Sequence, residues 1–185
     1  MKALNLHFSS TGNTRKVAET ISETLRQAGF SVHEVAAKDA GGIDLLDYDL
    51  LFLGSGVYEW LPGKPLQNLL AEMRKKYVQT GQISPGSPKR PDQKAVVYCT
   101  YGGGHTGINE AVPAVKYMAQ IFDHLGIEVL AEWYVVGEYH GRLKEFSKTG
   151  RLGDISGRPD ERDLHHVAER VRGILKVWPG YGQGT

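Results

Sequence analysis

Residues 3–18 read ALNLHFSSTGNTRKVA and carry the pattern on which the fold depends. Residues 3–8 form an apolar run of strand length, and a short polar turn follows. After the turn, apolar side chains recur on one helical face, and Gly29 stands where a left-handed helix cap is placed. That face consists of Val17, Ala18, Ile21, Leu25 and Ala28. The stretch predicts a strand, a tight turn and a helix, which together form one βα unit.

The same order repeats along the chain. Further strands are expected at residues 30–35, 50–53, 95–99 and 128–136. The first of these alternates apolar and polar residues, as a half-buried edge strand does, and the second is continuously apolar, as a strand covered on both faces is. Helical patterns run through residues 66–73, ending near Tyr77, through 112–125, closed by Gly126, and through 164–174, where Pro159 marks the helix start. The pattern predicts an α/β fold, a doubly wound parallel sheet of five strands in the order 2-1-3-4-5 with helices on both faces.

Two long segments lack this periodicity. Residues 79–93 are rich in proline and glycine and predict an exposed loop. Residues 137–158 predict a polar excursion with one helical turn, which follows the fifth strand on the side of the sheet where ligands bind. This excursion, with Tyr139, His140 and Arg142, is either part of a substrate or partner site or a plain surface connection.

The composition is that of a folded protein of one domain. Of the 185 residues, 41% are apolar and 23% charged, and the mean hydropathy is −0.34, which excludes the disordered and membrane classes. We expect one domain over residues 1–178 and a flexible tail over residues 179–185.

Charge and cysteine content restrict the partners and the location. The net charge of +1 argues against a nucleic-acid partner. The first apolar run is too short for a signal peptide or a membrane span. Cys99 is the single cysteine, which excludes an internal disulfide and an all-cysteine metal site and suits a reducing compartment. We therefore expect a cytoplasmic protein without a membrane span.

The turn after the first strand has the composition of an anion site. Four hydroxyl side chains, one amide and one glycine lie where a helix N-terminus adds free N–H groups and a positive dipole. Ordinary helix capping is the alternative interpretation, but six consecutive small polar residues exceed what capping requires. The nucleotide-binding pattern GxxxxGK[ST] is absent. The residues of this turn are Ser9, Ser10, Thr11, Gly12, Asn13 and Thr14.

This turn resembles the phosphate loop of the flavodoxin family, [ST]-x-T-G-x-T. Ser9, Thr11, Gly12 and Thr14 match the pattern, and Ser10 and Asn13 occupy its variable positions. The order of strands and helices agrees over residues 1–176. The resemblance implies a flavodoxin-like fold and implies that these six residues bind the 5′-phosphate of FMN.

A second candidate loop follows the third strand, at residues 54–60. Its glycines allow a flat ligand to approach the backbone, and Tyr58 and Trp60 can cover an aromatic ring. The alternative is a tight turn whose aromatic residues pack on a neighbouring helix. In the flavodoxin family this loop lies against the isoalloxazine ring, and a glycine peptide flips to bond the reduced N5 atom. The resemblance therefore implies Ser55, Gly56, Val57, Tyr58 and Trp60 as FMN-binding residues, with Gly56 as the candidate for the flip.

A third candidate loop follows the fourth strand and contains four glycines in six residues. Its exposed backbone groups suit the pyrimidine edge of a flavin, and the alternative is a mobile surface loop. By resemblance, Tyr101 stacks on the ring and the glycine amides bond its oxygens. His105 either stabilises negative charge or donates a proton, or is a solvated loop residue. The candidates in this loop are Thr100, Tyr101, Gly102, Gly103, Gly104, His105 and Gly107.

Other conspicuous residues suggest no further chemistry. His165 and His166 are neighbours on the last helix and point in different directions, so they indicate a polar face and no metal site is predicted. Cys99 ends an apolar strand and is expected to pack as a small buried side chain.

We interpret the chain as an FMN-binding redox protein that transfers electrons to or from a partner protein. The alternatives are an NAD(P)H-dependent FMN or quinone reductase and, less well supported, a binding module of this fold without flavin. Electron-carrying flavodoxins are strongly acidic, and this chain departs from them with its net charge of +1. Residues 60–98 have a net charge of +5 and form either a solvated surface or a docking surface for an acidic partner or NAD(P)H. The sequence does not predict an oligomeric state.

Overall fold

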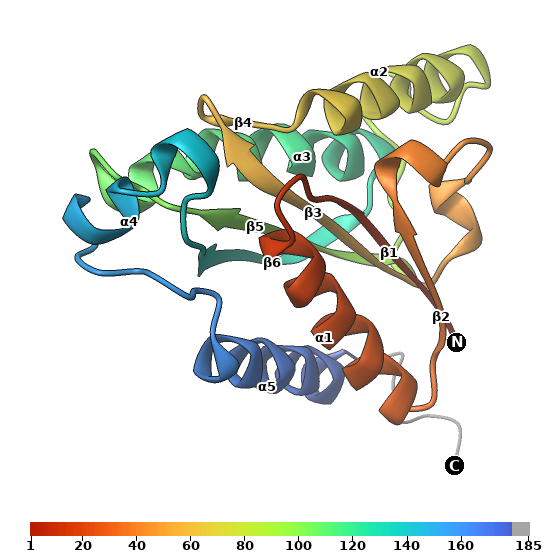
Figure 1. Cartoon of the computed structure of the whole chain (residues 1–185). Coiled ribbons are helices and arrows are strands. Elements are labelled where there is room, and N and C mark those ends of the chain that lie inside the picture. Colours follow the sequence, from red (N-terminus) through yellow and green to blue (C-terminus); the bar gives the residue numbers. More distant parts are fainter. Residues whose placement is uncertain (179–185) are drawn as a thin grey trace.

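The computed structural model describes residues 1–178, which fold around one largely parallel sheet (Figure 1). The order β2-β1-β3-β5-β6 is the predicted doubly wound order of five strands, and a short β4 pairs antiparallel with β3 at its end. The expected flexible tail at residues 179–185 lies outside the described residues. The strands are β1 Lys2–Phe8, β2 Ser31–Ala36, β3 Leu50–Tyr58, β4 Leu61–Pro62, β5 Lys94–Tyr101 and β6 Glu128–Val136.

Helices cover both faces of the sheet. Figure 1 shows α1 and α5 on one side of the sheet and α2 and α3 on the other. The helices are α1 Asn13–Gln27, α2 Lys64–Gln79, α3 Val112–Leu125, α4 Phe146–Thr149 and α5 Glu161–Val177. Short 3-10 turns are η1 Ala37–Asp39, η2 Leu45–Asp47, η3 Gly107–Glu110 and η4 Gly141–Leu143. Among residues 1–178, no helix combines the length and the apolar character needed to cross a membrane.

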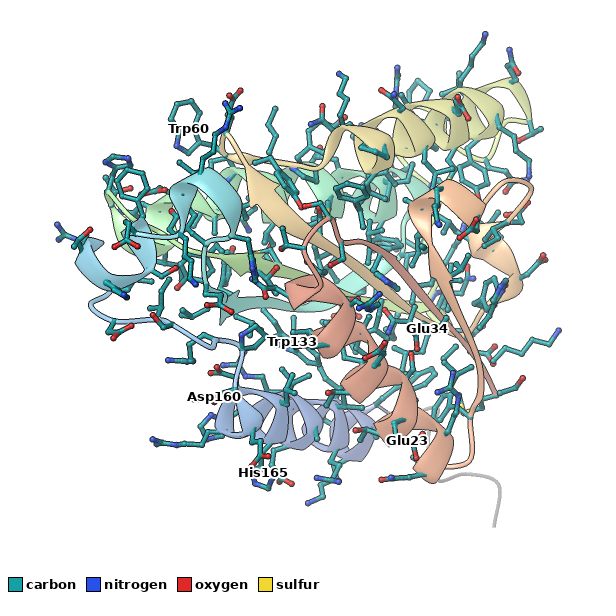
Figure 2. All side chains as sticks on the ribbon, viewed as in Figure 1. Glu23, Glu34, Trp60, Trp133, Asp160 and His165 are labelled. Atoms are coloured by element: carbon teal, nitrogen blue, oxygen red, sulfur yellow. The ribbon has the colours of Figure 1, made fainter. Side chains whose placement is uncertain are left out.

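The central strand β3 shows why the sheet has two cores. Leu51 and Leu53 belong to the core between the sheet and helices α2 and α3. Leu50 and Phe52 belong to the core with α1 and α5, where the Phe52 ring packs against Trp133. Figure 2 labels Trp133 in this core. Because successive side chains of a strand point to opposite faces, the continuous apolar run supplies both cores. The edge strand β2 is only partly buried, as its alternating sequence predicts.

A buried group of polar side chains links the sheet to α1. Asn5 on β1 donates to the carbonyl oxygen of Ala18 at 2.8 Å and to the hydroxyl of Ser22 at 3.0 Å. The Tyr98 hydroxyl donates to Asn5 Oδ1 at 2.8 Å. The Tyr98 ring lies over Gly54, where a Cβ atom would be 2.1 Å from the ring. Gly54 therefore makes room for Tyr98, whereas the sequence suggested room for a ligand.

Two predicted boundaries need correction. The third strand does not end at residue 53 but continues to Tyr58, so most of the predicted loop is strand. Pairing with β1, β4 and β5 satisfies the backbone there and outweighs the low strand propensity of the glycines. Pro159 precedes the last helix rather than starting it, since Asp160 is the N-cap and shares a reciprocal capping box with Asp163.

Candidate functional site

A cavity of about 820 Å³ lies at the carboxyl ends of the central strands. All three predicted loops and the segment 137–158 contribute to its lining. The predicted residues that line it are Ser10, Thr11, Asn13, Thr14, Gly56, Val57, Tyr58, Trp60, Thr100, Tyr101, Gly102, Gly103 and His105. Ser9, Gly12, Ser55, Gly104 and Gly107 were also predicted but are not among the lining residues. The topology thus brings together segments more than a hundred residues apart in sequence, because parallel strands all end at this edge.

The turn at residues 9–14 ends at the N-terminus of α1. Gly12 occupies the N-cap in the left-handed region, with φ of 101°, and no side chain caps the helix. The first turn has no acidic residue, and the N–H groups of this turn have no partner within the helix. The Gly12 N–H donates to Ser9 Oγ at 3.1 Å, so Ser9 shapes the turn from outside the cavity. The result is a positive, uncapped helix end that faces the cavity.

Hydroxyl groups connect this turn to the neighbouring strands. Thr14 is buried, and its hydroxyl lies 2.7 Å from that of Thr100 at the end of β5. The Ser10 hydroxyl lies 2.5 Å from that of Tyr58 at the end of β3. These contacts place the three predicted loops against one another.

The β3–β4 hairpin forms a second wall. The buried Ser55 hydroxyl donates to the Gly56 carbonyl at 2.7 Å and accepts from the Gly63 N–H at 3.0 Å, so Ser55 holds the hairpin together. Gly56 pairs with Thr100 within the sheet. The left-handed residues of this hairpin are Glu59 and Trp60, with φ of 48° and 68°. The unusual backbone thus lies at the tip and not at Gly56.

The aromatic side chains of the hairpin are exposed. Tyr58 is 38% exposed and Trp60 is 61% exposed, and both line the cavity. The Tyr58 ring contacts Phe8, and Trp60 lies at the tip of the hairpin (Figure 2). They are therefore available to cover a ligand in the cavity, and the alternative of aromatic residues packed on a helix does not describe Trp60.

The glycine-rich loop after β5 is built by neighbouring side chains. A Cβ atom on Gly102 would be 2.2 Å from the Tyr139 ring, and the Tyr139 hydroxyl accepts from the Gly104 N–H at 2.9 Å. The Glu110 carboxylate accepts from the N–H groups of His105 at 2.7 Å and Thr106 at 2.6 Å. Gly102 thus makes room for the Tyr139 ring. The Tyr139 hydroxyl and the Glu110 carboxylate hold the backbone of this loop through hydrogen bonds.

The segment 137–158, which we call the strap, reaches the same cavity. The Asn13 side chain donates to the Glu138 carbonyl at 2.9 Å, and its Oδ1 lies 3.2 Å from His140 Nε2. Of the three side chains considered from sequence, Tyr139 and His140 line the cavity and Arg142 does not. The lining residues that sequence reasoning missed are Glu59, Leu61, Pro62, Lys64, Gln67, Glu110, Gly137, Glu138, Leu143 and Phe146. For the residues of the strap, the sequence did offer a signal: the strap follows a parallel strand, and it therefore starts at the edge of the sheet where the other loops lie.

Burial shifts the pKa values of four side chains in or close to the segments that form the cavity. Burial raises the pKa of the Tyr101 and Tyr139 hydroxyls, so both remain protonated near neutral pH. Cys99 is fully buried in the core, which confirms the expected packing, and this burial raises the pKa of its thiol. Burial lowers the pKa of His7, whose Nδ1 is the one buried side-chain nitrogen or oxygen without a hydrogen-bond partner in residues 1–178.

Several other charged residues singled out by sequence lie apart from the cavity or pair with other side chains, whereas Lys64 of the basic stretch lines the cavity. His165 lies on the outward side of α5 (Figure 2), and within residues 1–178 no cluster of His, Cys, Asp or Glu could hold a metal ion. In the basic stretch 60–98, Lys76 pairs with Asp44 and Lys94 pairs with Glu128, each at 3.0 Å. Arg90 bonds the Leu125 carbonyl and Gln82. This stretch is therefore not a continuous set of free cations.

Comparison with known proteins identifies the family. The sequence pattern of the family described as Flavodoxin matches residues 6–163, which is most of the chain. The chain belongs to the flavodoxin family. It is an FMN-binding redox protein of that family, as the resemblance of residues 9–14 implied.

Three proteins illustrate what this flavodoxin-family protein is similar to. A flavodoxin-like domain-containing protein BilS from Clostridioides difficile (strain CD3) is 33% identical over 78 residues, a match that spans 42% of this chain and 44% of that protein. Oxidised flavodoxin 1 from Bacillus cereus has a TM-score of 0.67 at 15% identity, covering 96% of this chain and 99% of the other. The flavodoxin of Streptococcus pneumoniae TIGR4 has a TM-score of 0.64 at 15% identity, covering 95% and 99%. At such identities the structural likeness concerns the fold.

The cavity of this flavodoxin-family protein fits FMN. Its volume is within the usual range for small-molecule sites, about 300–1,000 Å³. The uncapped N-terminus of α1, with no carboxylate in its first turn, suits a phosphate. Aromatic residues on the β3–β4 hairpin and on the strap provide flat apolar walls for a ring system.

Proposed function

We propose that this protein carries electrons between protein partners, with FMN held in the cavity described above. The observation that carries the proposal is the exposure of Tyr58 and Trp60 beside that cavity. A ring bound against these side chains has an edge at the protein surface, where a partner can approach it. We include in this proposal a single domain over residues 1–178 and a cytoplasmic location, both supported by the composition.

The phosphate is assigned to the turn at residues 9–14. Thr11 and Thr14 offer hydroxyl donors, and the N–H groups at the start of α1 point the same way. Ser9 and Gly12 contribute by shaping the turn, because Ser9 Oγ accepts from the Gly12 N–H. Binding an anion here requires no lysine or arginine, since the helix dipole supplies the favourable potential.

The ring is assigned to the space between the β3–β4 hairpin and the loop after β5. FMN supplies the one- and two-electron chemistry when bound. Tyr58 and Trp60 cover one side, while Tyr101 and the backbone of Gly102 and Gly103 border the other. Neutral Tyr101 and Tyr139 hydroxyls and backbone N–H groups orient the ring without adding charge. The flip at Gly56 stays a prediction, and it would require breaking the bond from Ser55 Oγ to the Gly56 carbonyl.

A reductase is the second candidate, and the apolar side of the strap favours it. Leu143 and Phe146 line the cavity with His105, whose ring contacts that of Phe146. Such a wall suits a flat apolar acceptor such as a quinone beside the flavin. In that case NAD(P)H would be the donor.

Anaerobic rapid mixing distinguishes the two functions. The protein loaded with FMN is mixed with NADH or NADPH, and separately the photoreduced protein is mixed with cytochrome c. The carrier proposal predicts stable flavin absorbance with both nucleotides and reduction of cytochrome c by the photoreduced protein, with the apo-protein as control. Rapid bleaching by either nucleotide contradicts the carrier proposal and supports the reductase.

A further inference from the structure

The outer part of the strap, residues 141–152, combines exposed cations with exposed apolar side chains. Its sequence GRLKEFSKTGRL contains four cations and one carboxylate, that of Glu145. The cations are Arg142, Lys144, Lys148 and Arg151, all exposed. Leu143, Phe146 and Leu152 are 50%, 41% and 37% exposed. This mixture gives a local charge of +3 on a surface that also presents apolar anchors.

These cations form no salt bridge within the described part of the chain, although Lys148 interacts electrostatically with the exposed Asp154. None of the four forms a salt bridge within residues 1–178, whereas cations elsewhere, such as Lys76, Lys94 and Lys116, do. Three nearby carboxylates accept backbone hydrogen bonds: Glu110 from loop N–H groups, Glu138 from the Gly157 N–H at 3.0 Å and Asp154 from the Ser156 N–H at 2.9 Å. The positive charge of the outer strap is therefore available to a binding partner.

The strap lies directly beside the cavity. Leu143 and Phe146 line it from the strap side, and Trp60 and Lys64 line it from the β3–β4 hairpin and the start of α2. A protein seated on the outer strap would therefore touch the mouth of the cavity.

Hydrogen bonds hold the strap in one conformation. The buried Ser147 hydroxyl accepts from the Tyr139 N–H at 2.8 Å, and the Ser147 carbonyl accepts from the Ile155 N–H at 2.7 Å. The Arg151 N–H donates to the Gly104 carbonyl at 2.9 Å. A preorganised surface loses little entropy when it binds, which favours association.

We propose that the outer strap is the docking surface for an acidic electron-transfer protein. This inference rests on the proposed carrier function and names the class of its partner. The cations would steer an acidic partner, while Leu143, Phe146 and Trp60 would form the apolar centre of the contact. A nucleotide is disfavoured as the occupant because the cations alternate with apolar side chains along an exposed surface and do not converge on one anion site.

The test uses two forms of one acceptor that differ in charge. The photoreduced, FMN-loaded protein is mixed with native cytochrome c, which is basic, or with succinylated cytochrome c, which is acidic. Each haem Fe(III) takes one electron from the reduced protein and becomes Fe(II). At low ionic strength we expect faster reduction of the acidic form, with a rate constant that falls as salt is added.

Two double variants with reversed charges test whether the outer strap causes the preference for the acidic acceptor. Arg142→Glu/Lys148→Glu should lower the rate constant for the acidic acceptor roughly tenfold at low salt and flatten its salt dependence. Arg170→Glu/Lys176→Glu on α5 changes the net charge equally and should leave the preference for the acidic acceptor intact. Flavin absorbance and circular dichroism check that both variants remain folded and loaded.

The possible failures are separable. Transfer to neither acceptor overturns the carrier function and this inference with it. Transfer to both acceptors at equal rates, or equal effects of the two double variants, overturns the inference and leaves the carrier function standing. If NADPH bleaches the flavin and Arg142→Glu/Lys148→Glu slows that bleaching, the strap binds a nucleotide. This result would also overturn the inference.

Discussion

Gly54 and Tyr98 form a single packing unit in the centre of the sheet. The Tyr98 ring occupies the place of a Cβ atom on Gly54 and reaches Asn5 with its hydroxyl. Gly54→Ala should therefore force the ring aside and lower the free energy of unfolding by about 1–3 kcal/mol. Urea denaturation measures this loss.

Gly173→Ala is the matched control for that substitution. A Cβ atom at Gly173 meets nothing within 4 Å, and the residue lies inside α5, so alanine should stabilise the protein by roughly 0.5–1 kcal/mol. Equal unfolding curves for Gly54→Ala and the wild type would contradict the packing role of Gly54.

Thr14 is the residue on which the phosphate assignment depends most. Its hydroxyl is buried, contacts Thr100 and lines the cavity at the start of α1. We expect Thr14→Ala to weaken FMN binding by about 1–3 kcal/mol, through loss of a charge-assisted hydrogen bond. Fluorescence titration of the apo-protein with FMN gives the dissociation constant.

Thr20→Ala controls for the loss of a threonine from the same helix. The Thr20 hydroxyl is exposed and donates to the Lys16 carbonyl at 3.0 Å, away from the cavity lining. FMN affinity should be unchanged in this variant. If both variants bind FMN as the wild type does, the phosphate does not depend on Thr14.

Helices α1 and α5 end in opposite ways at their N-termini. Helix α1 has no side-chain cap and no acidic first turn, which leaves its N–H groups for a ligand. Helix α5 begins with the Asp160–Asp163 capping box, and Asp163 also forms an ion pair with Arg158. The N-terminus of α5 thus stabilises its own helix, whereas the N-terminus of α1 is the one to which we assign the phosphate.

Asp163 makes the free energy of unfolding of the protein dependent on pH. Burial raises the pKa of this carboxyl, but bonds from Arg158 and the Asp160 N–H lower it more, so the net pKa lies below its ordinary value. A depressed pKa means that the ionised form stabilises the fold above about pH 4, and that this contribution disappears as pH falls through the folded-state pKa. Asp163→Asn should cost about 1 kcal/mol at pH 7.

The pH dependence of the Asp163→Asn effect is the informative measurement. Urea denaturation of both proteins between pH 7 and pH 2.5 should show the stability gap narrowing as the acidic limit is approached. A gap that stays constant over this range would mean that the ionised carboxylate does not contribute through its charge.

At the scale of the whole molecule, local patterns predicted most of the fold. The strands, the helices and the turn at residues 9–14 follow from short periodic runs and from one motif, because each depends on neighbouring residues. The strand order follows from the match of that alternating pattern to the doubly wound topology. Gly54 and Gly102 could not be interpreted in this way. Their partners, Tyr98 and Tyr139, lie 44 and 37 residues away, and only packing reveals which ring fills the space.

The role of the strap was undecided for the same reason. The sequence places it at the correct edge of the sheet, but its contacts with Asn13 connect residues 125 and 127 positions apart. The sequence also does not show which charged side chains form ion pairs. Two cations in residues 60–98, Lys76 and Lys94, form salt bridges, whereas none of the four cations of the outer strap does so within residues 1–178.

Comparing FMN with riboflavin tests the central claim most directly, because the two ligands differ only by the phosphate assigned to residues 9–14. In fluorescence titrations of the apo-protein, FMN should bind at least about tenfold more tightly than riboflavin, and Thr14→Ala should reduce that preference. Equal affinities for the two ligands in the wild type would contradict the assignment of the phosphate to the start of α1.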